Sequence, residues 1–77
     1  MIFIIKKKVM MKMYKYIIYY DGEWLRDSSD MGFTYETEEE AEHEAKVDVE
    51  SYMKDWENEN CQYDKDLFEF EIVEVRI

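Results

Sequence analysis

The residues most suggestive of chemistry have the spacing of a calcium-binding loop. Four of them match positions 1, 3, 6 and 12 of the EF-hand pattern, in which oxygen ligands surround a Ca²⁺ ion: Asp27, Ser29, Gly32 and Glu38. Met31 stands at position 5, where the pattern requires an oxygen ligand. The segment therefore predicts a polar turn followed by a helix cap, and we expect no bound metal. A calcium titration of the thermal melt tests the alternative.

The single cysteine and the single histidine form no catalytic pattern. Cys61 has no second cysteine to pair with, which indicates a reducing compartment and a cytoplasmic protein. His43 lies between two glutamates near the start of a predicted helix, where a surface position is expected. The sequence has no Ser-His-Asp spacing, glycine-rich phosphate loop, CxxC pair or HExxH motif. We therefore expect a non-enzymatic protein that needs no cofactor.

Charge is the feature of the sequence that says most about function. The chain has 20 acidic and 10 basic residues, and five of the basic ones precede residue 20. All 20 acids lie in Asp21–Ile77 with the other five basic residues, so this part carries a charge of −15. Solubility of a small domain needs a net charge of only about 2–8. Such a surface repels phosphates, which argues against direct nucleic-acid binding, and attracts basic proteins.

Residues 13–20, MYKYIIYY, are mostly β-branched and aromatic and predict a strand. With a period of two, its faces carry Tyr14, Tyr16, Ile18 and Tyr20 on one side, and Met13, Lys15, Ile17 and Tyr19 on the other. Asp21-Gly22 predicts a two-residue hairpin turn. The returning strand begins at residues 23–25, and the polar residues 27–30 interrupt it before residues 33–36 become extended again.

The segment from Thr37 to about Asn58 predicts one long amphipathic helix. Thr37 and Glu40 match a capping box, and three consecutive glutamates in the first turn complement the helix dipole. Apolar residues recur at spacings of three and four, and they form one stripe: Ala41, Ala45, Val49, Tyr52, Met53 and Trp56. We expect Tyr52 and Trp56 to belong to the core.

Residues 67–77 predict the final strand, with Phe68, Phe70 and Ile72 on one face. The simplest arrangement is an α+β fold in which a three-stranded, mainly antiparallel sheet of order 2-1-3 (β-β-α-β) carries the helix on one face. Residues 13–77 form this single acidic domain. Residues 1–12 are a basic and apolar extension or an extra strand at residues 2–5, too short for a signal peptide or a membrane span.

The second face of the predicted sheet combines apolar and acidic side chains. Its central and third strands contribute Ile17, Tyr19, Glu69, Glu71, Val73 and Val75. Exposed apolar groups bordered by charge often mark a protein interface. The alternative is that the N-terminal segment covers this face.

Size, charge and element order together resemble those of small acidic phage-encoded anti-defence proteins, of which anti-CRISPR inhibitors are the best-known group. The resemblance covers about residues 13–77: the hairpin at Tyr14–Leu25, the acidic helix at Thr37–Asn58 and the terminal strand. It implies a DNA mimic whose carboxylates replace phosphates in the basic groove of a CRISPR nuclease or another phage-defence protein. The basic N-terminus departs from this picture.

We therefore predict an inhibitor or binding module that docks on a basic, nucleic-acid-binding protein and contacts neither nucleic acid nor membrane. The predicted partner-binding residues are Asp27, Asp30, Glu38, Glu39, Glu42, Asp48, Glu50, Asp55 and Glu57. The alternative is a self-associating structural domain or homodimer. In it, residues 6–15 of one copy would pair with the acidic body of another, and Ile17, Val73 and Val75 would supply apolar contact.

Overall fold

The Asp21-Gly22 pair makes the tight turn of a hairpin in the computed structural model, which describes residues 12–76. Strands β1 (Lys12–Tyr20) and β2 (Glu23–Asp27) pair antiparallel on either side of it. Asp21 and Gly22 have φ angles of 50° and 77°, the positive values that a type I′ turn requires. The predicted extra strand at residues 2–5 lies outside the described residues.

A single long helix follows the hairpin, as the sequence predicted. A short 3₁₀ turn, η1 (Ser28–Met31), leads from β2 into an extended stretch and then into α1 (Glu38–Asn58). The Thr37 hydroxyl accepts a hydrogen bond of 3.1 Å from the Glu40 amide, which satisfies one free donor at the helix start. The polar residues after β2, predicted to form a turn before the helix cap, form this 3₁₀ turn.

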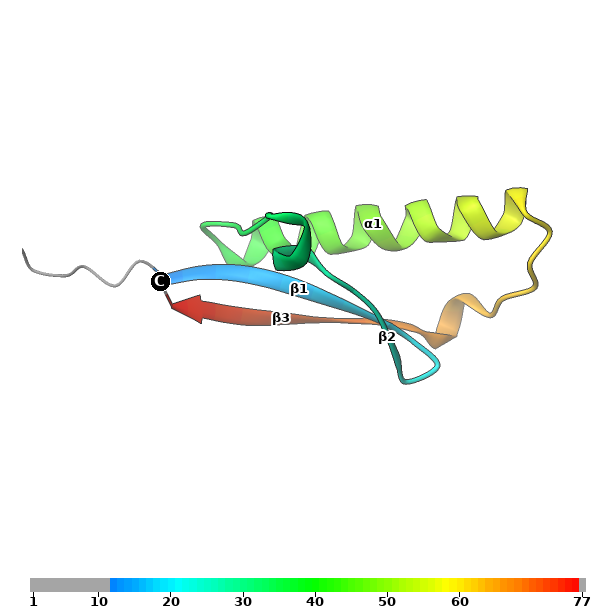
Figure 1. Cartoon of the computed structure of the whole chain (residues 1–77), viewed down its shortest axis with the longest axis horizontal. Coiled ribbons are helices and arrows are strands. Elements are labelled where there is room, and N and C mark those ends of the chain that lie inside the picture. The colour runs from blue at the N-terminus through cyan, green and yellow to red at the C-terminus, as the bar shows by residue number, and fades with distance from the viewer. Residues whose placement is uncertain (1–11, 77) are drawn as a thin grey trace, which may run out of the picture.

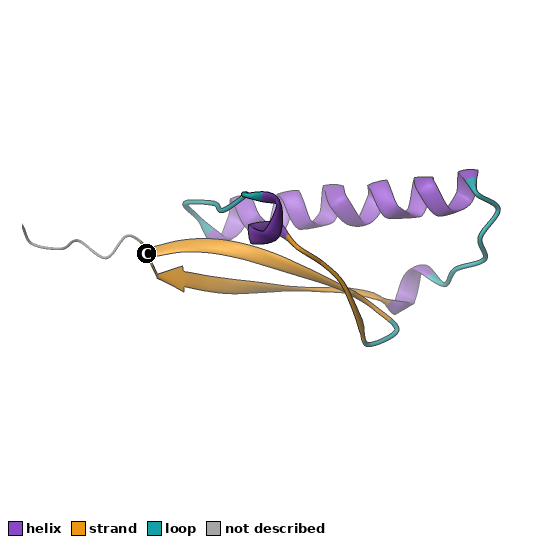
Figure 2. Cartoon of the chain, in the orientation of Figure 1, coloured by secondary structure: helices purple, strands orange, loops and turns teal. Residues whose placement is uncertain are grey.

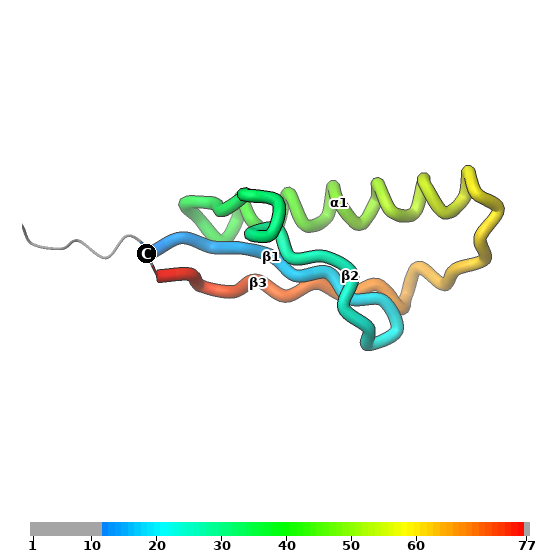
Figure 3. Tube along the Cα trace, in the orientation of Figure 1, coloured from blue at the N-terminus to red at the C-terminus, as the bar shows by residue number. Residues whose placement is uncertain are grey.

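The third strand completes the sheet in the predicted order. After a second 3₁₀ turn, η2 (Lys65–Leu67), strand β3 (Phe68–Arg76) pairs antiparallel with β1 along its whole length. The sheet order is β2-β1-β3, so β3 is an edge strand among the described residues. β1 begins and β3 ends at the same end of the sheet (Figure 3). The prediction of an α+β fold with one helix is confirmed.

α1 covers one face of the sheet, and within residues 12–76 no helix lies on the other face (Figures 1 and 2). Tyr16 and Ile18 on β1 are buried against Ala45 of α1, whose small side chain allows close approach. The rest of the core comes from partly buried side chains that pack around this centre: Leu25, Tyr35, Val49, Tyr52, Phe68, Phe70 and Ile72. The face assignments made from the period of two are therefore correct for β1 and β3.

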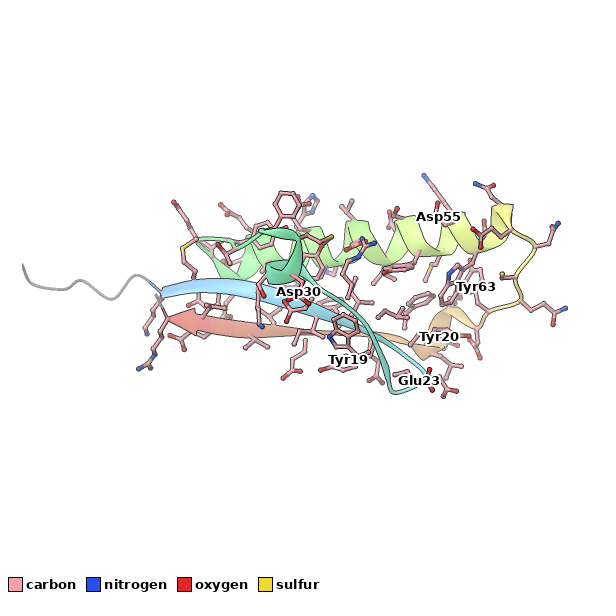
Figure 4. The ribbon with its side chains drawn as sticks, viewed as in Figure 1. Tyr19, Tyr20, Glu23, Asp30, Asp55 and Tyr63 are labelled. Carbon is pink, nitrogen blue, oxygen red and sulfur yellow. The ribbon has the colours of Figure 1, made fainter. Side chains whose placement is uncertain are left out.

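Aromatic rings close the end of the core near the last turns of α1. The rings of Trp56 and Phe68 have centroids 4.9 Å from that of Tyr20, and Tyr63 lies 5.9 Å from Trp56. The Tyr20 hydroxyl also accepts a 3.0 Å hydrogen bond from the Asp64 amide. Tyr20 and Tyr63 thus join the sheet to the loop after α1 (Figure 4). The expected core role of Tyr52 and Trp56 is confirmed.

A β-bulge in the hairpin changes which side chains reach the helix. The register shifts between Ile18 and Tyr19, so that Ile18 pairs with Arg26 and Tyr19 pairs with Trp24. Leu25 packs in the core and Arg26 bonds to α1, so two consecutive residues point to the same face. The strict alternation of a regular strand would have placed one of them on the open face.

Candidate interaction surface

Seven of the nine acids predicted to contact a partner are exposed. They lie on η1 and on α1: Asp30, Glu38, Glu39, Glu42, Glu50, Asp55 and Glu57. Two of the seven already make bonds within the chain, since Glu42 pairs with Lys46 at 3.2 Å and Glu57 accepts a hydrogen bond from the Tyr63 hydroxyl. Asp55 stands on the helix side of the molecule, away from the sheet (Figure 4).

Asp27 does not present a free carboxylate to a partner. Its side chain caps η1 by accepting hydrogen bonds of 2.9 and 2.7 Å from the amide and hydroxyl of Ser29. Lys15 forms an ion pair with its other oxygen at 2.7 Å. Burial works against ionisation, but these hydrogen bonds outweigh it and hold the pKa of Asp27 below its ordinary value. The first residue of the calcium-like spacing is therefore the cap of a turn.

Asp48 is likewise bound inside the protein, contrary to the role predicted for it. It lies on the inner side of α1, 9% exposed, and both carboxylate oxygens are bonded. Oδ1 accepts a 2.7 Å bond from Arg26, and Oδ2 accepts a 2.7 Å bond from the Tyr16 hydroxyl. The Arg26 guanidinium also lies 4.8 Å above the centre of the Tyr52 ring. Through these bonds Asp48 links α1 to β1 and β2.

The same network shifts the titration of its members. Burial, followed by the hydrogen bond to Asp48 and the negative charge there, raises the pKa of Tyr16 well above its ordinary value. Burial lowers the pKa of Arg26, but the bond to Asp48 more than compensates and the net shift is upward. Both shifts favour a neutral Tyr16 and a charged Arg26.

Sequence reasoning missed Arg26 and Tyr16 as partners of Asp48. One signal was present, because Asp48 stands three residues after Ala45 and four before Tyr52, on the edge of the apolar stripe. A carboxylate at that position must find a donor or remain outside the core. The donor depends on the bulge that turns Arg26 toward α1.

The exposed acids are most concentrated at the first turns of α1. Five glutamates lie within seven residues there: Glu38, Glu39, Glu40, Glu42 and Glu44. The exposed His43 is among them, and Lys46 follows. The positive end of the helix dipole favours carboxylates at the first turn. The glutamates in the first turns of α1 are thus compatible with a stable helix.

The face of the sheet opposite α1 is partly apolar, as predicted. Ile17, Val73 and Val75 are half-buried there, and Trp24 is 55% exposed. Tyr19 lies on this side (Figure 4) and donates a 3.2 Å hydrogen bond to Glu71. No helix or strand among the described residues covers this open sheet face.

A groove between η1 and α1 has a volume of about 440 Å³. Its walls are Met31 and Phe33 on one side and Val47 on the other. The Arg26–Asp48 pair lies at its base. A second hollow of about 320 Å³ lies between α1 and β3, with Lys46 and Lys65 at its rim.

Within residues 12–76, no group of three or more His, Cys, Asp or Glu side chains is arranged to hold a metal ion. Cys61 is exposed. No helix in the same range is long and apolar enough to cross a membrane.

The fold and surface together define a small α+β domain of β-β-α-β topology with an acidic helix. No protein-family model matches the chain, and neither the curated proteins nor the solved structures gave a significant match.

Proposed function

We propose that this protein is a non-enzymatic, cytoplasmic binding module that inhibits a basic, nucleic-acid-binding protein by occupying its phosphate-binding surface. The observation that carries the proposal is the set of exposed carboxylates on one helix. Of the nine acids on α1, only Asp48 is buried. The anti-CRISPR inhibitors that the chain resembles would make a phage-defence nuclease the kind of partner to test first.

The number of exposed charges on α1 is close to that of a DNA strand of the same length. A helix of 21 residues is about 30 Å long at a rise of about 1.5 Å per residue. One strand of DNA places a phosphate every 3.4 Å or so, which gives roughly nine charges over that length. The eight exposed acids of α1 nearly equal this number. Two lysines, Lys46 and Lys54, reduce the net charge of the helix.

The number of acids also supports binding rather than solubility alone. Twenty carboxylates on one small chain repel one another and reduce stability, and solubility does not require so many. Exposed charges of one sign steer an oppositely charged partner and speed its association. The expected complex therefore forms quickly at low salt and weakens as salt rises.

The first experiment is a pull-down from nuclease-treated bacterial lysate at low and high salt, with the purified protein as bait. We expect retention of a basic, nucleic-acid-binding protein that high salt releases. The triple variant Glu39→Lys, Glu42→Lys and Glu50→Lys should abolish that retention. A matched variant with Glu69→Lys, Glu71→Lys and Glu74→Lys changes the net charge equally but on β3. Full-strength binding by the α1 variant would refute the proposal.

A second candidate function is self-association through the open sheet face. It is favoured by the half-buried Ile17, Val73 and Val75, which no described element covers. The basic segment of residues 6–15 would then contact the acidic body of another copy. Sedimentation at several concentrations separates the two functions. An oligomer lost on deleting residues 1–10 or on Val73→Ser would support self-association, whereas a monomer at all concentrations would exclude it.

A further inference from the structure

Exposed apolar side chains gather at the groove between η1 and α1. Five large hydrophobic residues are well exposed among those the structure describes: Trp24, Met31, Phe33, Val47 and Leu67. Three of these, Met31, Phe33 and Val47, line this one groove. Its volume of about 440 Å³ falls in the range of roughly 300–1,000 Å³ that is typical of binding pockets. Aromatic and apolar walls of this kind commonly hold the anchor side chain of a partner.

The base of the groove is rigid and electrically balanced. Arg26 is bonded to Asp48, and Asp48 is bonded to Tyr16, so the two charges of the pair offset each other. The Tyr16 and Tyr35 rings are stacked, with their centres 6.0 Å apart, and both residues line the groove. Ionic and aromatic contacts therefore fix the shape of the groove before any partner arrives.

The rim of the groove carries uncompensated negative charge. Glu44 is exposed at the rim and forms no ion pair among the described residues. Glu40 precedes it by one turn on the same side of α1, and Asp30 is exposed on η1. Among residues 12–76, Arg26 is the one basic residue that lines the groove, and it forms an ion pair with Asp48. An anion is therefore disfavoured here and a cation is attracted.

From this combination of walls and charge, we propose that the groove receives an arginine side chain of the protein partner. The aliphatic stem would pack between Phe33 and Val47, and the guanidinium would face Glu44. A planar guanidinium stacks on aromatic rings and is more weakly hydrated than an ammonium group, so arginine fits these walls better than lysine. This inference rests on the proposed function, because it names the anchor by which the basic partner would be held.

A small probe tests the groove without knowledge of the partner. N-acetyl-arginine N-methylamide is titrated into the ¹⁵N-labelled full chain at millimolar concentrations, beside the norleucine and glutamate analogues. We expect saturable shifts of the Met31, Phe33 and Val47 amide signals that are largest with arginine. The change Glu44→Gln should weaken the arginine response several-fold and leave the norleucine response unchanged. Shifts absent from the groove, or as large with glutamate, would overturn the inference.

A matched pair of variants carries the test to the complex. Phe33→Ser with Val47→Ser removes two walls at positions 55% and 47% exposed, so the fold should survive, as a thermal melt verifies. Trp24→Ser with Leu67→Ser is the control, since these side chains are also exposed and lie outside the groove. We expect the groove variant to raise the Kd for the captured partner at least about tenfold, and the control to stay near the original value.

The two proposals fail in different ways. If the α1 charge variant loses the partner while the groove variant keeps it, the groove inference is wrong and the proposed function stands. If the arginine probe binds but no basic protein is captured, the groove is a real cation site and the inhibitor function is wrong.

Discussion

Replacing Asp48 with alanine should destabilise the domain far more than its place in an acidic helix suggests. Asp48→Ala leaves the buried Tyr16 hydroxyl without its acceptor, and an unsatisfied buried polar group costs about 1–3 kcal/mol. It also removes the carboxylate from Arg26. Breaking a fully buried ion pair costs roughly 3–5 kcal/mol. The Arg26 side chain is 37% exposed, so water compensates most of this, and about 1 kcal/mol remains.

The total of about 2–4 kcal/mol is a large fraction of the stability of such a chain, which at 0.05–0.15 kcal/mol per residue is roughly 4–12 kcal/mol. The melting temperature should fall by about 10–30 °C, because 1 kcal/mol shifts a domain of this size by about 4–8 °C. Urea unfolding followed by circular dichroism gives the free energy directly.

Asp55→Ala is the matched control, since it makes the same substitution at an exposed site on the same helix. It should keep or slightly raise stability, because alanine is the better helix former. A double-mutant cycle with Tyr16→Phe then isolates the hydroxyl, and Asp48→Ala should cost less in that background. If Asp48→Ala unfolds no more easily than Asp55→Ala, the reasoning about the buried network is wrong.

Three further predictions follow from the same structure. Asp27 has a pKa below its ordinary value of 3.8, so its stabilising effect is present above that pH and is lost as pH falls. In Asp27→Asn, the free energy of unfolding measured with urea should therefore decrease less as pH falls, and an unchanged decrease would contradict this. Tyr16 has a pKa above its ordinary value of 10.0, so its stabilising effect is lost as pH rises beyond 10.0. Above that pH, the free energy of unfolding of Tyr16→Phe should fall less steeply than that of the original protein, by about 1.4 kcal/mol per pH unit. Equal slopes for the two proteins would exclude the effect. Ala45 is fully buried, so Ala45→Leu should cost about 1–3 kcal/mol in thermal or urea unfolding, while the exposed Val47→Leu should cost nothing measurable.

Local chemistry was enough to predict the elements and their order. Asp21-Gly22 has few conformational alternatives between two apolar strands, and both residues take the positive φ that the turn needs. The capping residue Thr37 and the apolar stripe predicted the helix, which begins and ends where expected. With a hairpin, a helix and one more strand, the order β2-β1-β3 follows from short connections.

The details of the surface depend on contacts between distant residues, which local patterns do not contain. From the sequence alone, Asp27 and Asp48 look like surface acids. In the structure they are buried and form ion pairs with Lys15 and Arg26 of the strands. The groove likewise needs the η1 turn to set Phe33 opposite Val47, although the two residues are far apart in the sequence. Only the tertiary arrangement reveals these pairings.

The edge position of β3 has a consequence for handling the protein. Its outer row of backbone amides and carbonyls has no partner among the described residues, and such an edge can template strand addition by another chain. Glu69, Glu71 and Glu74 are exposed along it, and their mutual repulsion between chains opposes that addition. Near the isoelectric point of about 4.4 this protection disappears with the net charge. The protein should then associate edge to edge, and storage well above that pH keeps it dispersed.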